Sequence, residues 1–278
     1  MPRKPLFWIL FSLCIMALSA PALVKAQDRI RLATTTSTQN SGLLEHLIPP
    51  FEKAAGVKVD IISVGTGKAL ALAKRCDVDS VMVHAPKLEE YFVTQGYGVD
   101  RRKLMHNFFV VVGPASDPAG VAQAKSVALA FQAIAKAKAP FVSRGDNSGT
   151  NVKEKAVWKA AGIKPSWAGY KEAGQGMGAV LTMSSQLQAY TLTDIGTFRK
   201  YLTTGKLELK VLLERDPLLK NPYSVILVNP AKCPKTKAGP AKAFMDYLVS
   251  PQGQSLIQNY KADGKQLFWP EAAPVKTK

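Results

Sequence analysis

The sequence predicts an α/β protein of two lobes, each a doubly wound sheet flanked by helices. Apolar segments of strand length alternate with segments of helical periodicity, which is typical of parallel βαβ units. Two breaks, at 117–120 and 221–222, enclose a block with the same alternation. We therefore expect lobe 1 to comprise residues 27–112 plus 221–278, and lobe 2 to comprise residues 113–220. The two crossings between the lobes would form a hinge beside a cleft.

The N-terminal segment predicts export. Arg3 and Lys4 precede an apolar run at 6–18, and small residues follow up to Ala26. This order is typical of a secretory signal peptide, here residues 1–26. Its removal takes away three basic residues and no acids, so the net charge falls from +17 to 17 − 3 = +14. Because the basic residues are dispersed and form no aromatic-basic motif, we expect a small anion as ligand and no nucleic acid.

In lobe 1 the expected helices have apolar residues three or four apart, with glycine or proline at their ends. The adjacent Pro49 and Pro50 are expected to kink or split the first of them. The expected strands are 29–33, 57–64, 80–84, 108–113 and, after the second break, 223–228. The expected helices are 43–54, 68–75, 86–96, 241–248 and one that begins at 251. The tail from 261 is expected to wrap or fray.

Lobe 2 is expected to repeat this alternation. Its predicted strands are 140–143, 190–193 and 209–213, and its predicted helices are 127–137, 151–161, 179–189 and 197–202. The glycine-spaced run 174–178 is interpreted as a tight turn into a helix, because it lacks the preceding strand and the acidic residue of a dinucleotide site.

One loop of lobe 2, residues 141–150, has the composition of an anion site. Ser148 is a good N-cap, so Gly149 and Thr150 would begin the next helix with unpaired backbone N–H groups. These groups, two hydroxyls and Arg144 could bind one anion together. The alternative is an ordinary capped helix with a surface arginine.

Two loops of lobe 1 strengthen the anion hypothesis. Residues 34–42 carry no large apolar side chain, and residues 65–67 read Gly-Thr-Gly. Both follow predicted strands and precede helices, which is where ligands bind in sheets of this kind. We therefore expect 34–42 to be a donor-rich loop at the cleft.

The cysteines and histidines give no metal-site pattern. Cys76 and Cys233 remain after export, where an oxidising compartment would allow them to pair. His46, His84 and His106 are scattered, so no metal site is expected. His84 ends a strand on the ligand side, where a structural role is expected.

Several blocks together resemble the tungstate-binding proteins of ABC transporters (TupA type). The blocks are Leu-Ala-Thr-Thr-Thr-Ser-Thr at 32–38, Val-Gly-Thr-Gly-Lys-Ala at 64–69, Ser-Arg-Gly-Asp at 143–146, Ser-Gly-Thr at 148–150, Gly-Gln-Gly-Met-Gly at 174–178, Tyr-Thr-Leu-Thr-Asp at 190–194 and Asn-Pro-Tyr-Ser at 221–224. The resemblance implies a periplasmic binding protein-like fold of type II, with two crossovers. It also implies capture of tungstate, or of molybdate, for an ABC permease and its ATPase.

The resemblance also implies which residues bind the oxyanion: Thr35, Thr36, Ser37, Thr66, Arg144, Ser148, Gly149 and Thr150. This chain departs from the family pattern at Asn151, where His is usual, and at Ile195, where Arg is usual. In the implied topology the strand 223–228 lies antiparallel beside 80–84. That arrangement brings Cys233 near Cys76 and suggests a disulfide between them.

The chemistry of the ligand leaves one alternative open. Tungstate carries no proton at neutral pH, so its site should offer hydrogen-bond donors only. Asp146 would suit a phosphate receptor if it faced the ligand, because a carboxylate can accept the proton of hydrogen phosphate. We expect Asp146 instead to pair with Arg144 or to cap the helix. A hydrolase with Ser148 as nucleophile is the other alternative, but no histidine lies near Ser148 in sequence. We expect a monomeric periplasmic binding protein without cofactor and without enzymatic activity.

Overall fold

The computed structural model describes residues 27–205, 207–262 and 264–272. The expected signal peptide lies outside these residues. The first part of the chain forms β1 (Arg29–Thr35), α1 (Thr36–Asn40), α2 (Leu43–Ala55), β2 (Lys58–Val64), α3 (Thr66–Lys74), β3 (Ser80–Val83), α4 (Pro86–Thr94) and the long strand β4 (Gly98–Pro114). Within the described residues, every helix is too short or too polar to cross a bilayer.

The middle of the chain contains the expected strands and helices, together with two 3₁₀ turns and the strand β6, which were not expected. It forms η1 (Val121–Gln123), α5 (Val127–Lys136), β5 (Phe141–Ser143), α6 (Gly149–Ala160), β6 (Tyr170–Glu172), α7 (Met177–Gln186), β7 (Thr191–Asp194), α8 (Ile195–Leu202), β8 (Leu209–Leu213) and η2 (Pro217–Leu219). The chain then returns through β9 (Lys220–Val228), α9 (Ala238–Val249), α10 (Pro251–Asn259), β10 (Lys261–Ala262), β11 (Lys265–Gln266) and β12 (Trp269–Pro270).

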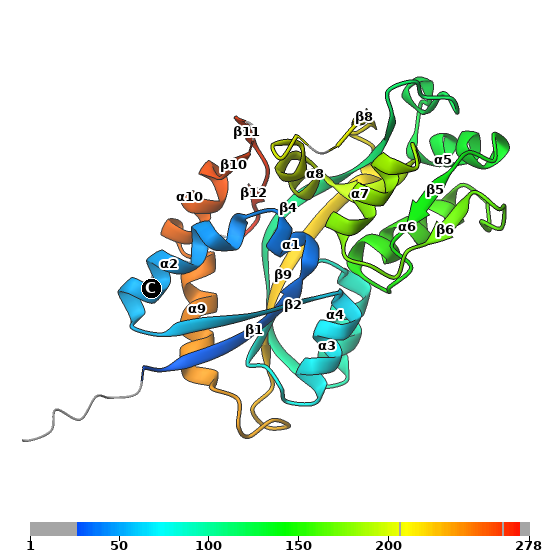
Figure 1. Ribbon diagram of the computed structural model, residues 1–278. Helices are drawn as coiled ribbons and strands as arrows, with labels where there is room; N and C mark the ends of the chain where they lie inside the picture. The colour runs from blue at the N-terminus through cyan, green and yellow to red at the C-terminus, as the bar shows by residue number, and fades with distance from the viewer. Residues whose placement is uncertain (1–26, 206, 263, 273–278) are drawn as a thin grey trace, which may run out of the picture.

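The first sheet has the order β12-β4-β9-β3-β1-β2 and is mixed. β2, β1 and β3 are parallel, whereas β9 runs antiparallel to both β3 and β4. Helices cover both faces (Figure 1) because apolar residues alternate along each strand. Ile30 and Leu32 of β1 pack under α2 and α9, whereas Ala33 packs under α3. The doubly wound sheet predicted for lobe 1 is therefore present, with an antiparallel extension.

β4 connects the first sheet to a second one. It pairs with β9 as far as Phe108, and from Phe109 onward it pairs with β7 and β8. Phe109 and Val111 of β4 join the core under α5 and α6, whereas Val110 and Val112 join the core under α7 and α8. The four cores do not mix residues from the two sheets. The division into two lobes joined by β4 and β9 (Figure 1) remains a proposal, and residues 109–112, expected in lobe 1, pack in the cores of the second sheet.

The segment 34–42 is not the open loop expected from the sequence. β1 continues to Thr35, and residues 36–40 form the short helix α1. Thr35 caps this helix, because its Oγ1 accepts a hydrogen bond from the backbone N–H of Thr38 at 3.2 Å. All five residues of α1 are polar, so the sequence has no apolar periodicity there from which a helix could be predicted.

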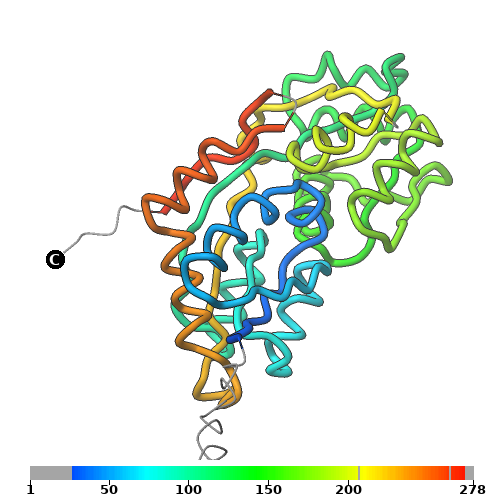
Figure 2. The backbone as a smooth tube through the Cα atoms, turned by 60° about the vertical axis from the view of Figure 1, so that its left-hand side comes forward, coloured from blue at the N-terminus to red at the C-terminus, as the bar shows by residue number. Residues whose placement is uncertain are grey.

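Two other expectations change. We expected Pro49 and Pro50 to kink or split this helix; α2 runs unbroken through both, so the split is wrong. The two carbonyls that lose their helical partners belong to Glu45 and His46, which are solvent-exposed and can bind water. The tail wraps rather than frays as far as it is described. Figure 2 shows it in red, where β12 lies antiparallel to β4.

Cys76 and Cys233 form a disulfide, with their Cα atoms 5.3 Å apart. The bond joins the end of α3 to the segment after β9, and these parts of the chain are 157 residues apart. β9 lies antiparallel to β3, as the expected topology requires. The disulfide therefore ties the first and last parts of the chain within one sheet layer.

Candidate oxyanion-binding site

Three loops meet where β1, β2 and β5 end. A Cβ built on Gly65, before α3, would lie 3.4 Å from Asp146 Oδ2 and 3.5 Å from Ser148 Cβ. One built on Gly67 would lie 2.9 Å from Asn147 Nδ2. The loop before α3 therefore packs directly on the loop before α6.

The loop before α1 joins the same cluster through Arg144. The side chain of Arg144 is 1% exposed, and its Nη2 donates to Asp146 Oδ2 at 2.5 Å and to Thr36 Oγ1 at 3.4 Å. A Cβ on Gly176, the residue before α7, would lie 3.5 Å from the same Thr36 oxygen. The turn 174–178 thus brings a fourth helix N-terminus to the cluster, which the sequence analysis did not assign to the site.

Three donors among the eight predicted residues are buried and lack a hydrogen-bond partner within the described residues. They are Thr66 Oγ1, Arg144 Nε and Thr150 Oγ1. Leaving a buried polar group unpaired costs about 1–3 kcal/mol, and native proteins contain few such groups. Three of them on two touching loops indicate a place where a hydrogen-bond acceptor binds.

The remaining predicted residues have internal partners. Ser148 Oγ caps α6 by accepting from the backbone N–H of Asn151 at 3.2 Å. Thr35 Oγ1 lies 2.7 Å from Thr38 Oγ1 and 3.1 Å from Ser37 Oγ. Gly149 lies at the first turn of α6, as predicted. The structure therefore brings the predicted residues together, and their roles as ligands remain a proposal.

Asp146 is held by the loop itself. Its Oδ2 accepts from Arg144, and its Oδ1 accepts from the backbone N–H of Ser148 at 3.1 Å. Asn151, one departure from the family pattern, is likewise engaged locally. Its Nδ2 donates to Ser143 Oγ at 3.3 Å, and its Oδ1 accepts from the backbone N–H of Asn147 at 3.1 Å.

Two carboxyl groups are buried near these loops. Burial raises the pKa of Glu154, whose oxygens accept from Ser143 Oγ, Trp158 Nε1 and Tyr170 OH. Burial also raises the pKa of Asp194, which caps α8 by accepting from the backbone N–H of Thr197 at 2.8 Å. Both oxygens of Glu154 have donors of their own, whereas Asp194 Oδ2 is buried and has no hydrogen-bond partner among the described residues.

His84 follows β3 and touches both sides of the cluster. Its Nε2 lies 3.2 Å from Ser37 Oγ, and a Cβ on Gly149 would lie 2.7 to 3.0 Å from its ring atoms. Burial lowers the pKa of His84 to about 4, so the imidazole is neutral at pH 7. The expected structural role suits these contacts, although nothing in the sequence located its partners.

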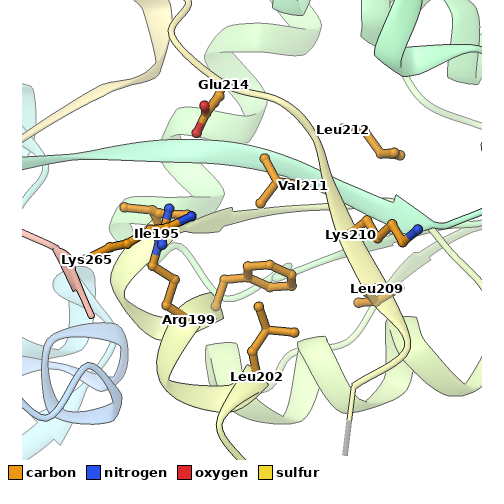
Figure 3. Close-up of a pocket in the computed structure, with 10 residues that line it drawn as sticks. Ile195, Arg199, Leu202, Leu209, Lys210, Val211, Leu212, Glu214 and Lys265 are labelled. Atoms are coloured by element: carbon orange, nitrogen blue, oxygen red, sulfur yellow. The ribbon is translucent and has the colours of Figure 1, made fainter. Parts of the chain in front are cut away.

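The pocket in Figure 3 lies elsewhere. It lies between α8 and β8 and is lined by Ile195, Arg199, Lys210 and Lys265 among others, and by none of the eight predicted residues. Ile195, the second departure from the family pattern, is buried in the core under α7 and α8. In the described part of the chain, no three His, Cys, Asp or Glu side chains gather in the manner of a metal site.

A fold with two crossing strands and donor-rich loops at strand ends is the architecture of extracytoplasmic solute receptors. Comparison with known proteins agrees with this class. The model of the PBP superfamily domain matches residues 22–252. A putative ABC transporter anion-binding protein of Haloferax volcanii is 50% identical over 88% of this chain and 72% of its own length.

Two further relatives place the chain more narrowly. The tungstate-binding protein TupA of Peptoclostridium acidaminophilum is 43% identical over 90% of this chain and 88% of its own length. The solved structure of the tungstate ABC transporter protein from Geobacter sulfurreducens has a TM-score of 0.79 and 50% identity, covering 84% of this chain and all of that one. The chain belongs to the PBP superfamily and, within it, to the family of these tungstate-binding proteins.

Proposed function

We propose that this protein is a periplasmic receptor that binds one tungstate ion between the loops before α1, α3 and α6 and delivers it to an ABC permease and its ATPase. The observation that carries the proposal is a set of three buried donors that have no partner in the described part of the chain, Thr66 Oγ1, Arg144 Nε and Thr150 Oγ1. Tungstate is a tetrahedral dianion without protons, so it requires donors alone. Helix N-termini and Arg144 supply favourable dipoles and one positive charge.

The contacts of Asp146 favour tungstate over phosphate. Both of its oxygens already accept hydrogen bonds, from Arg144 and from the helix backbone. A receptor for hydrogen phosphate would need an acceptor turned toward the ligand, whereas these contacts turn the Asp146 carboxylate toward its own loop. Tungstate and molybdate differ little in size and charge, so molybdate is expected to bind to the same groups. Each hydrogen bond to the anion is expected to contribute about 1.5–3 kcal/mol.

The same contacts argue against catalysis. Ser148 Oγ accepts the hydrogen bond that caps α6, and the neutral His84 contacts Ser37 and Asn221 rather than Ser148. We propose further that the protein is a monomer without cofactor or enzymatic activity, and that the signal peptide at 1–26 directs its export.

Calorimetric titration of the protein without residues 1–26 tests this function, with tungstate, molybdate, sulfate and phosphate as ligands. We expect one tungstate per chain at nanomolar affinity, which corresponds to about 12 kcal/mol, and no comparable binding of phosphate. Binding of phosphate without tungstate would make the protein a phosphate receptor. Silence with all four anions would overturn the oxyanion proposal.

A further inference from the structure

A closed ring of hydrogen bonds links the segment at the start of α1 to β4 and β9, the two strands that pass between the lobes. Ser37 Oγ lies 3.2 Å from His84 Nε2, and His84 Nδ1 lies 2.9 Å from Asn221 Oδ1. Asn221 Nδ2 donates to Asn107 Oδ1 at 2.7 Å. Asn107 and Asn221 face each other on β4 and β9, where the chain passes between the sheets.

The ring closes through the N-terminus of α8. Asn107 Nδ2 lies 3.5 Å from Asp194 Oδ1, and that oxygen also accepts from the backbone N–H of Thr197 at 2.8 Å. Thr197 Oγ1 donates to the carbonyl oxygen of Ser37 at 3.0 Å. Ser37, His84, Asn107, Thr197 and the other members are all nearly fully buried. Water therefore cannot easily substitute for any partner in the ring.

The chemistry of the ring fixes the direction of each hydrogen bond. Asp194 Oδ1 is an acceptor, so the amide nitrogen of Asn107 must face it and the amide oxygen must face Asn221. Asn221 consequently points its own nitrogen at Asn107 and its oxygen at His84. His84 must then carry its proton on Nδ1, as assigned by the network.

The second ring nitrogen of His84 is therefore an acceptor. Burial lowers the pKa of His84 to about 4, with the hydrogen bond to Asn221 opposing this shift and the charges of Arg144 and Lys153 adding to it, so the ring carries one proton at pH 7. Nε2 has only a lone pair to offer, and the group beside it is the hydroxyl of Ser37. A hydroxyl has a single proton, which is then shared with His84 and not with a ligand.

We propose that His84 is a positioning residue of the anion site whose Nε2 accepts the hydrogen bond of the Ser37 hydroxyl, so that Ser37 meets the oxyanion through its main chain only. The inference rests on the proposed function. It divides the hydroxyls of the site into two kinds: that of Ser37 builds the site, and those of Thr66 and Thr150 bind the anion.

Packing around His84 supports the positioning role. Its ring stacks on Tyr223, with the centroids 4.7 Å apart and the planes inclined by 21°. The opposite contact is with Gly149, at the first turn of α6, where a Cβ would not fit. The imidazole is thus held between β9 and the loop before α6 while it orients the segment at the start of α1.

The first test is nuclear magnetic resonance of the histidine ring nitrogens in the full mature protein. His46→Gln and His106→Gln identify the signals without touching His84. We expect the Nδ1–H tautomer for His84, unchanged from pH 8 to pH 5, with and without tungstate. The Nε2–H tautomer, or a doubly protonated ring at pH 7, would overturn the proposal.

The second test compares two hydroxyl deletions by tungstate calorimetry. Ser37→Ala should weaken binding about threefold, because it disturbs only the support of the site. Thr150→Val should weaken binding tenfold or more, and Thr150→Ser should restore most of it. Equal losses for Ser37→Ala and Thr150→Val would overturn the proposal. If the wild-type protein binds no oxyanion, the proposed function fails, and the tautomer still tests the role of His84.

Discussion

The binding loops before α1 and α6 contain similar residues but use them differently. Before α1, the hydroxyls of Thr35 and Ser37 all have partners inside the protein. Before α6, the hydroxyl of Thr150 and the Nε of Arg144 have none among the described residues. It follows that a hydroxyl-rich segment of sequence can indicate where an anion site lies, but not which of its hydroxyls bind the anion.

The physical cause lies in how each helix is stabilised. A short helix needs tertiary contacts to persist. α6 has Val157 and Trp158 in its core, and α3 has Ala69 and Leu70, so their first-turn donors remain free. α1 buries only Ser37 and Thr38 and must be held by its own polar side chains.

The largest effect is expected from Arg144→Ala. The variant removes the only formal charge predicted to bind the anion, and with it the Nε donor and the Nη2 contact to Thr36. The two charge-assisted hydrogen bonds, one to the anion and one that orients Thr36, amount to about 3–6 kcal/mol, so tungstate affinity should fall by between about a hundredfold and about ten-thousandfold. Arg215→Ala, at a largely exposed arginine, is the matched control in calorimetry and should bind as the wild type does. A loss of less than tenfold in Arg144→Ala would contradict the account.

The next effect concerns His84, which contacts Ser37 of α1, and it changes the stability of the protein rather than its affinity for tungstate. The pKa of His84 is about 4 in the folded protein and about 6.5 in the unfolded chain, so the unfolded state binds more protons between these values. The resulting stability is complete above pH 6.5 and is lost as the pH falls toward 4, by about 3 kcal/mol in total.

Urea unfolding of the wild type and of His84→Gln, from pH 7 to pH 4, measures this effect as a difference, in which the other titrating groups cancel. The advantage of the wild type should shrink by about 1.4 kcal/mol per pH unit below pH 6. Parallel curves for the two proteins would show that His84 titrates normally.

A smaller effect on tungstate affinity is expected when a single hydroxyl donor, such as that of Thr66, is removed. Thr66→Val keeps the shape of the side chain and removes one unpartnered oxygen, so tungstate affinity should fall about tenfold. Because the hydroxyl is unpartnered without the anion, stability in its absence should stay the same or rise slightly. Thr66→Ser serves as the control that retains the donor. Wild-type affinity in Thr66→Val would remove Thr66 from the site.

The smallest effect on affinity is expected from Gly149→Ala. Gly149 lies at the first turn of α6 and contacts His84, which in turn contacts Ser37 of α1. The new Cβ would lie 2.7 to 3.0 Å from the ring of His84, so either that ring or the first turn of α6 must shift. We expect tungstate affinity to fall a fewfold, with dissociation in stopped-flow experiments accelerated by the same factor. An unchanged dissociation rate would indicate that the contact with His84 does not set the geometry of the site.

The comparison also shows what the sequence could predict. Strands such as β1 and β3 were readable because their apolar residues alternate toward two cores, and Ser148 was readable as a cap. The first half of β4 was missed because Arg101, Arg102 and Lys103 give it little apolar character. The ring through His84 was missed because several of its contacts join residues more than 100 positions apart, as the contact between Asn107 and Asn221 does. No local pattern records such a contact.

The most direct measurement is diffraction from crystals of the tungstate complex, with data collected across the tungsten absorption edge to locate the metal atom. The account predicts one anomalous peak per chain, with oxyanion atoms within hydrogen-bond distance of Thr66 Oγ1, Arg144 Nε and Thr150 Oγ1, and with Ser37 Oγ still turned toward His84. A peak in the pocket between α8 and β8, or an anion bound without Arg144, would contradict it.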